Sequence, residues 1–362
     1  MSSSSSGPSV RKSLFVIASV VTVCVLFLAS SSNSAAVLGT SPSSNLVVNC
    51  QSHVCVYVGS CQDCESIYVI YGTRVVKTID LKVLVNQDNQ EAWDYSSGLV
   101  IVPSESYIIL INATTNTVFK IIKSKYLSCA EGALYNPIRN EVLLSNTCGS
   151  TLSVINATTW KLEPMNIKVG NTPLFLAYNS ANREIYVSNF NSDSSGGLCG
   201  NNVTAISAST DQVIKTITIA LSCPEGIAFN PANNETYVAS GSSDAVSAIT
   251  LLNLKNEIIQ TIHIRNKFGF TPGLLNSGNG KVFAYGGTEG SVYLISSTNK
   301  VSKVSGFFGL TGEGAYDPFN GYEYMEVATG TGNYIQMLSG TRILPINISL
   351  ALGAQAITTT AG

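Results

Sequence analysis

The chain has 362 residues, of which 45% are apolar and only 12% are charged, and its formal net charge is −2. This composition is too apolar for a disordered chain and, after the first thirty residues, too polar for a protein with several membrane spans. A nearly neutral chain without clusters of Lys and Arg lacks the field that attracts phosphate backbones, so nucleic acid is excluded as an expected partner.

The N-terminal segment, residues 1–36, has the features of an export signal. Arg11 and Lys12 form a short positive region, residues 14–29 carry no charge, and small side chains follow at the positions that a signal peptidase reads. The apolar stretch is shorter than the roughly 20 residues of a spanning helix, which favours a cleaved signal peptide over an uncleaved membrane anchor. Both interpretations place the rest of the chain outside the cytoplasm, with residues 37–44 as a Ser-rich linker.

Three segments in the middle of the chain are copies of one unit. They start at Glu131, Leu174 and Glu225 and read EGALYNPIRNEVLLSN, LFLAYNSANREIYVSN and EGIAFNPANNETYVAS. Each copy contains an apolar strand, an Asn-rich turn and a second strand, and a third and a fourth strand follow. β-branched residues dominate and turn residues recur about every eight to twelve positions, which indicates strands rather than helices.

Seven copies of this unit fill residues 45–362. The seventh copy begins near Val54 and lacks a first strand, and the missing strand is QAITTT at residues 355–360. Pairing of these two chain ends closes a ring and protects the strand edges. The sequence therefore predicts an all-β fold, a seven-bladed β-propeller closed by pairing of the C-terminal strand with the N-terminal blade. The further copies cover residues 91–122, 272–304 and 313–348.

One copy carries the signature of a known repeat. The YVSN motif at residues 186–189 follows a PxxxAYN stretch at residues 173–179 and precedes strands of the form VxxI and VIxTI. This copy resembles the YVTN-type β-propeller repeat family, which is well represented among archaeal surface-layer and cell-surface proteins. The resemblance spans about residues 45–362 and implies a propeller at the cell surface. Because propellers serve as enzymes, scaffolds and adhesins alike, it implies no particular ligand.

Glutamates recur immediately before the innermost strands in this alignment, and Gln355 takes their place in the closing blade. Innermost strands line the central channel, so we expect these side chains near one of its mouths. Converging carboxylates there could bind a cation such as Ca²⁺, which takes oxygen ligands. Leu174 and Pro272 interrupt the set. This favours the simpler interpretation that Glu is a common turn residue here, which points to solvent or accepts hydrogen bonds from backbone N–H groups. The four glutamates are Glu91, Glu131, Glu225 and Glu313.

Eight cysteines follow the apolar N-terminal segment, an even number that suits disulfides in an exported protein. Cys129 and Cys223 share one repeat position, and Cys148 and Cys199 share another. Both positions lie on the same face of the expected ring. We therefore predict the bonds Cys129–Cys148 and Cys199–Cys223.

The other four cysteines form a cluster that also contains His53, and two interpretations are open. Cys and His at such spacing are typical zinc ligands. In an exported protein two disulfides are favoured, because oxidising compartments stabilise them. The four are Cys50, Cys55, Cys61 and Cys64.

Five N-x-S/T patterns predict N-glycosylation in an exported chain. Two lie in identical INATT turns on the face opposite the cysteines, and another lies within a strand. The five asparagines are Asn112, Asn156, Asn202, Asn234 and Asn347.

Signals for catalysis are sparse. The chain has only two histidines, His53 and His263, and none of the signatures of serine hydrolases, zinc proteases, P-loop proteins or dinucleotide enzymes. The sequence favours an exported, extracellular cell-surface or surface-layer-associated propeller that binds protein or glycan without catalysis. The alternative is an exported lactonase- or lyase-like enzyme with carboxylates and a metal at the channel mouth, because two carboxylates suffice for some hydrolyses.

Overall fold

The structure is a computed structural model, and most of the predicted propeller is described in it. The predicted export segment, residues 1–36, and the linker, residues 37–44, lie outside the described residues. No helix in the described part of the chain is long and apolar enough to cross a membrane. The described strands belong to one compact unit, Ala35–Gly362. The described residues are 48–60, 64–85, 90–190, 199–241, 247–264, 273–276, 280–286, 291–307, 310–329, 332–350 and 354–359.

The described residues form seven antiparallel sheets of four strands, which we call blades 1 to 7 and give from the innermost strand outward. Blade 1 contains β28 (Ala354–Thr359), β1 (Val56–Ser60), β2 (Cys64–Tyr71) and β3 (Arg74–Val85). Blade 2 contains β4 (Ala92–Asp94), β5 (Leu99–Ser104), β6 (Tyr107–Asn112) and β7 (Thr117–Lys123). Blade 3 contains β8 (Ala130–Asn136), β9 (Glu141–Asn146), β10 (Thr151–Asn156) and β11 (Lys161–Lys168). Blade 4 contains β12 (Pro173–Asn179), β13 (Glu184–Asn189), β14 (Asn202–Ser207) and β15 (Val213–Thr218).

Blades 5 to 7 repeat this order. Blade 5 contains β16 (Pro224–Asn230), β17 (Glu235–Gly241), β18 (Ser247–Leu252) and β19 (Ile258–Ile264). Blade 6 contains β20 (Gly273–Asn276), β21 (Val282–Gly286), β22 (Ser291–Ile295) and β23 (Val301–Lys303). Blade 7 contains β24 (Leu310–Asp317), β25 (Tyr322–Thr329), β26 (Gly332–Ser339) and β27 (Arg342–Leu350).

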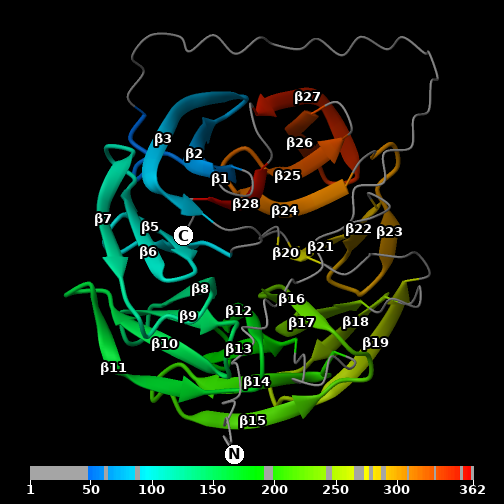
Figure 1. Cartoon of the computed structure of the whole chain (residues 1–362). Helices are drawn as coiled ribbons and strands as arrows, with labels where there is room; N and C mark the ends of the chain where they lie inside the picture. The colour runs from blue at the N-terminus through cyan, green and yellow to red at the C-terminus, as the bar shows by residue number, and fades with distance from the viewer. Residues whose placement is uncertain are drawn as a thin grey trace, which may run out of the picture. The chain divides into compact units, whose positions relative to one another are not determined.

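The seven blades form a ring around their innermost strands (Figure 1). Each innermost strand contacts the next, from β4 through β8, β12, β16, β20 and β24 to β28, and β28 contacts β4. The C-terminal strand β28 pairs antiparallel with β1, with Ile357 opposite Val58 and Thr358 opposite Tyr57. The predicted seven-bladed propeller, closed by its two chain ends, is thereby confirmed.

Burial follows the position of each strand within a blade. The second strands β5 and β9 are buried at every residue, because neighbouring blades cover both of their faces. The fourth strands β11 and β15 are mostly exposed, and Ile167 and Ile217 are their buried residues. The core therefore consists of apolar layers between adjacent blades rather than one central cluster, as with Ile101 of blade 2 and Ala133 of blade 3.

A tyrosine of the second strand joins several blades to the next one. Its hydroxyl reaches the hairpin between the third and fourth strands of the following blade, where Asn256 and Asn299 have a positive φ. Asn tolerates this left-handed conformation and also offers a side-chain oxygen as acceptor. These contacts tie neighbouring blades together at their outer turns. They are Tyr57 to Asn116 Oδ1, Tyr186 to Asn256 Oδ1 at 2.5 Å, Tyr237 to Asn299 Oδ1 at 2.6 Å and Tyr324 to the Gly72 carbonyl at 3.0 Å.

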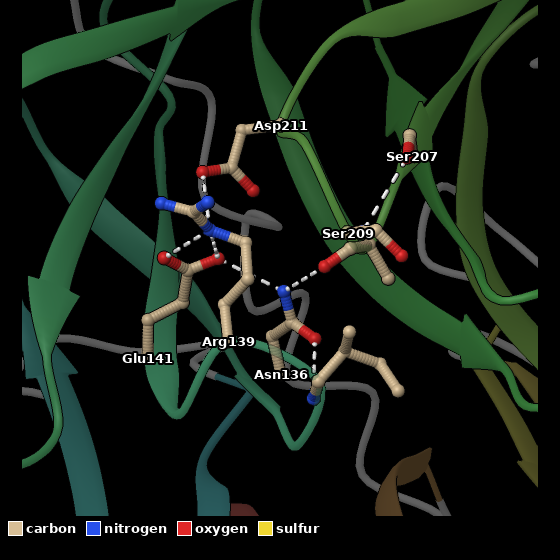
Figure 2. A network of polar contacts seen from close by, with 8 residues as sticks. Asn136, Arg139, Glu141, Ser207, Ser209 and Asp211 are labelled. Atoms are coloured by element: carbon tan, nitrogen blue, oxygen red, sulfur yellow. Dashed lines mark hydrogen bonds and ion pairs between the residues drawn. The ribbon is translucent and has the colours of Figure 1, made fainter.

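Between blades 3 and 4 an ionic network replaces this contact (Figure 2). Leu143 occupies the tyrosine position, and Asp211, with a φ of 60°, occupies the hairpin position. The Arg139 Nε lies 3.1 Å from Glu141 Oε2 and 3.0 Å from Asp211 Oδ2, so one guanidinium joins carboxylates from two blades. Asn136 Nδ2 adds a hydrogen bond to Glu141 Oε1 at 2.9 Å.

The environment of Asp211 disfavours its ionised form. Burial raises the pKa of its carboxyl, the nearby Glu141 raises the pKa further, and Arg139 opposes both effects. Desolvation therefore outweighs the attraction of the arginine, whose side chain is 44% exposed.

Candidate binding site

The predicted set of channel-mouth carboxylates is not at one repeat position. Asp94, Asn136, Asn230 and Asp317 pair with the first residues of the second strands and so mark equivalent positions. Counted from these markers, Glu131 and Glu225 lie five residues upstream, Glu313 four and Glu91 three. The alignment of Glu with Glu was therefore wrong for Glu91 and Glu313, because strand pairing sets the register and a common turn residue does not.

These glutamates also differ from one another in burial, whereas the ligands of one shared cation site would have similar surroundings. Glu91 and Glu225 are buried, at 7% and 4% exposed, whereas Glu131 is half-buried. The side chains of Glu313 and Gln355 lie outside the described residues. Among the described residues, no three His, Cys, Asp or Glu side chains are grouped so that they could hold a metal ion.

The register shows a different recurring feature, an aromatic residue followed by Asn or Asp at the end of the innermost strand. The oxygen of the Asn or Asp side chain accepts a hydrogen bond from the backbone N–H two residues later, which fixes the turn to the second strand. This pair, rather than the glutamate, is the signal that aligns the blades correctly. The five pairs are Trp93-Asp94, Tyr135-Asn136, Tyr178-Asn179, Phe229-Asn230 and Tyr316-Asp317.

Aromatic residues from blades 2, 3 and 4 line a hollow of about 350 Å³ where these strands end. Tyr95, in the turn after β4, is 53% exposed, and Trp93 and Tyr178 are half-buried. Tyr135 is almost covered, with 8% of its surface exposed. Glu91 also lines the hollow, which we call the aromatic hollow.

The turn that carries Tyr95 is held in place by its neighbours. Asp94 is fully buried, and its Oδ1 accepts hydrogen bonds from the Ser96 N–H at 2.9 Å and the Ser96 hydroxyl at 2.7 Å. The Ser97 hydroxyl donates to the other carboxylate oxygen at 2.5 Å. The Tyr95 ring meets the Tyr135 ring edge to face, with centroids 5.3 Å apart. An exposed aromatic side chain thus stands on a preorganised turn.

Gln90, which also lines the aromatic hollow, joins three blades. Its side-chain amide donates to the Leu176 carbonyl and accepts from the Leu176 N–H, both at 2.8 Å. Its backbone N–H donates to the Glu131 carbonyl at 3.0 Å, and its carbonyl accepts from the Ala133 N–H at 2.8 Å. The hollow is therefore bordered by rigid backbone. No pattern in the sequence had marked Gln90, Trp93, Tyr95 or Tyr178 as a binding residue, although Tyr178 belongs to the PxxxAYN stretch of the repeat.

The two disulfides that the repeat alignment predicted are both present, with the predicted partners. Cys129 and Cys148 are bonded with their Cα atoms 5.4 Å apart, and Cys199 and Cys223 with theirs 4.8 Å apart. The first bond lies within blade 3. The second joins the loop after β13 in blade 4 to the residue before β16 in blade 5.

The N-terminal cysteine cluster is only partly described. Cys50 and Cys55 form a disulfide, which removes the thiolates that the zinc interpretation requires of them. Cys61 and the side chain of Cys64 lie outside the described residues. His53 is exposed, and its Nδ1 lies 3.0 Å from the Ser52 hydroxyl.

The five glycosylation candidates differ in their surroundings. Asn112 and Asn156 end the third strands of blades 2 and 3, and their Oδ1 atoms accept backbone N–H groups of the following turn. Asn234 is exposed in a turn, whereas Asn202 and Asn347 lie within β14 and β27. Glycosylation of any of them stays a prediction. The second histidine, His263, is exposed on the outer strand β19.

Comparison with known proteins identifies the fold alone. No family model and no curated protein matches the sequence. A protein of unknown function from Desulfotomaculum acetoxidans is similar in structure, with a TM-score of 0.62 at 14% identity over 83% of this chain and 99% of the other. Hydrazine synthase of Kuenenia stuttgartiensis gives 0.58 at 13% identity over 71% and 78%, and a chain of the nidogen/laminin complex gives 0.51 at 10% over 73% and 98%. Membership of the YVTN-type family stays a prediction.

Proposed function

We propose that this chain is an exported propeller that works outside the cytoplasm, at the cell surface or in a surface layer, as a non-catalytic binding protein. The three disulfides among the described residues carry the proposal. Their Cα atoms are 4.8 to 5.4 Å apart, within the roughly 4.4–6.8 Å that such bonds require. Disulfides persist in oxidising compartments and are rare in the cytosol, so their presence supports export.

Binding is supported by the way the turns of the innermost strands are built. The buried side chains of Asp94, Asn136 and Asn179 hold these turns by hydrogen bonds. A partner that binds here meets a surface that is already ordered, so little conformational entropy is lost on association. The partners that we propose for this surface are proteins or glycans of the cell envelope.

The test begins with the location of the protein in its source cells. Intact cells are treated with a protease that cannot enter them, and envelope, medium and cytoplasm are then probed for the chain. We expect the chain in the envelope or the medium and sensitive to the protease. A protected cytoplasmic chain whose thiols all react with iodoacetamide before reduction would refute export. Mass spectrometry of unreduced peptides should identify the Cys129–Cys148 and Cys199–Cys223 bonds.

A further inference from the structure

We infer that the aromatic hollow binds a neutral oligosaccharide by stacking sugar rings on its aromatic side chains. This inference rests on the proposed function, because it names the ligand of a surface binding protein. The hollow combines three features that favour such a ligand. It has exposed aromatic side chains, turns fixed by buried hydrogen bonds, and strands from three blades that meet around it.

The aromatic side chains suit the apolar face of a pyranose. One face of a pyranose carries C–H groups, whose partial positive charge is attracted to the negative face of an aromatic ring. Tyr95 is 53% exposed, and Trp93 and Tyr178 are half-buried, so each retains surface for a ligand. Tyr and Trp have few rotatable bonds, and the edge contact between Tyr95 and Tyr135 restricts motion further. Stacking here therefore needs little ordering of the protein.

The charge of the hollow points to a neutral ligand. Glu91 is the charged residue among those that line the aromatic hollow, and it is 7% exposed. Both carboxyl oxygens of Glu91 are buried beneath this surface, and the residues that line the hollow include no Lys or Arg. A phosphate or an acidic sugar would therefore find no counter-charge among these residues. A neutral sugar brings hydroxyl groups, which exchange hydrogen bonds with the hydroxyls of Tyr95 and Tyr178.

The size of the hollow limits the part of the ligand that it holds. A volume of about 350 Å³ is at the lower end of the roughly 300–1,000 Å³ of small-molecule sites. The aromatic hollow therefore accommodates one or two sugar rings and leaves the remainder of a chain outside. The part of the glycan that it would hold is thus a terminal or internal unit.

The experiment is a screen of the purified, exported full chain against an array of neutral oligosaccharides, followed by calorimetric titration of the strongest binder. We expect the variant Tyr95→Ala to weaken that binding about tenfold and Tyr178→Ala to weaken it as well. Tyr126→Ala is the matched control. Tyr126 is 63% exposed and lines a separate hollow between the outer strands, so its loss should leave the affinity unchanged.

A second measurement leaves every residue of the aromatic hollow unchanged. The chain contains two tryptophans, so the variant Trp160→Phe leaves Trp93 as its only one. Addition of the sugar should change the Trp93 emission with the same midpoint as calorimetry. Absence of any neutral oligosaccharide binder, or a binder that is insensitive to Tyr95→Ala and leaves Trp93 emission constant, overturns the inference. Because cell fractionation tests the proposed function separately, a surface protein without sugar binding would refute this inference alone.

Discussion

Removal of one buried hydroxyl between blades 5 and 6 measures what the tyrosine contact contributes to the propeller. Tyr237 is fully buried, and its hydroxyl donates to Asn299 Oδ1 at 2.6 Å and accepts from Asn233 Nδ2 at 2.7 Å. In blade 6 the equivalent residue is Phe283, which is also fully buried. The substitution Tyr237→Phe therefore changes the hydrogen bonds with little change in packing.

The magnitude follows from the partners that remain. Asn233 Nδ2 loses the Tyr237 hydroxyl as an acceptor but keeps Glu235 Oε2 at 2.8 Å, so the lost hydrogen bond is partly compensated. Asn299 Oδ1 loses the donor of a short hydrogen bond, and a buried polar group left without its partner costs about 1–3 kcal/mol. Asn299 is half-buried, so water replaces part of the lost contact. We expect Tyr237→Phe to lower the free energy of unfolding by about 1–2 kcal/mol.

The assay is urea unfolding of the wild type, Tyr237→Phe, Asn299→Gly and the double variant. Glycine adopts the positive φ of Asn299 without strain, so Asn299→Gly removes mainly the side-chain contacts. Each variant should lose part of the free energy of unfolding. We expect the sum of the two single-variant losses to exceed the loss of the double variant by about 1 kcal/mol, and this difference is the coupling energy of the pair. The exposed control Tyr126→Phe should change stability by less than about 0.5 kcal/mol. Additive effects of the two single changes would refute the proposed role of the hydroxyl.

Three further predictions concern charge and covalent links. Burial raises the pKa of Glu323 to about 7, above its unfolded value, so the protonated carboxyl favours the fold and this contribution is lost as pH rises through about 7. Unfolding in urea should therefore show the wild type to be more stable at pH 5 than at pH 8, and Glu323→Gln should reduce this difference by up to about 3 kcal/mol. The raised pKa of Asp211 acts in the same direction and leaves part of the difference in the variant, whereas an unaltered slope contradicts the role of Glu323. Arg139→Met should destabilise the chain by about 1 kcal/mol at pH 8 and by less at pH 5, where Asp211 is protonated, and equal losses at both pH values would count against the ionic network. The pair Cys199→Ser with Cys223→Ser opens a link across 24 residues, so calorimetry should show a lower Tm, corresponding to about 3 kcal/mol, and an unchanged Tm would contradict a stabilising role.

Much of the architecture could be predicted because each blade is encoded locally. Strand, turn and strand recur in every copy, and the incomplete copy near Val54 and the surplus strand at the C-terminal end predicted the pairing of β28 with β1. Cys129 and Cys223 take the same position before their innermost strands, so the repeat also predicted two disulfide partners.

The candidate site was predicted less well, and the reason is the register. Aligning Glu91 and Glu313 with Glu131 treated a turn residue as a marker, although one shift of register turns a strand side chain to the other face. The pairs Trp93-Asp94 and Tyr135-Asn136 carry the true register, since Asn and Asp are required to hold the turn that follows.

The sequence by itself determined the number of blades, their strand order and two disulfide pairs, because the strands and the cysteine positions repeat with a short period along the chain. It also determined the closure of the ring, because the strand that one copy lacks stands at the other end of the sequence. Tertiary structure alone decided which side chains of different blades meet. The amide of Gln90 bonds to Leu176, 86 residues away, and Arg139 reaches Asp211 in the next blade. Such contacts depend on how adjacent sheets pack around the ring, and no local pattern of residues records that geometry.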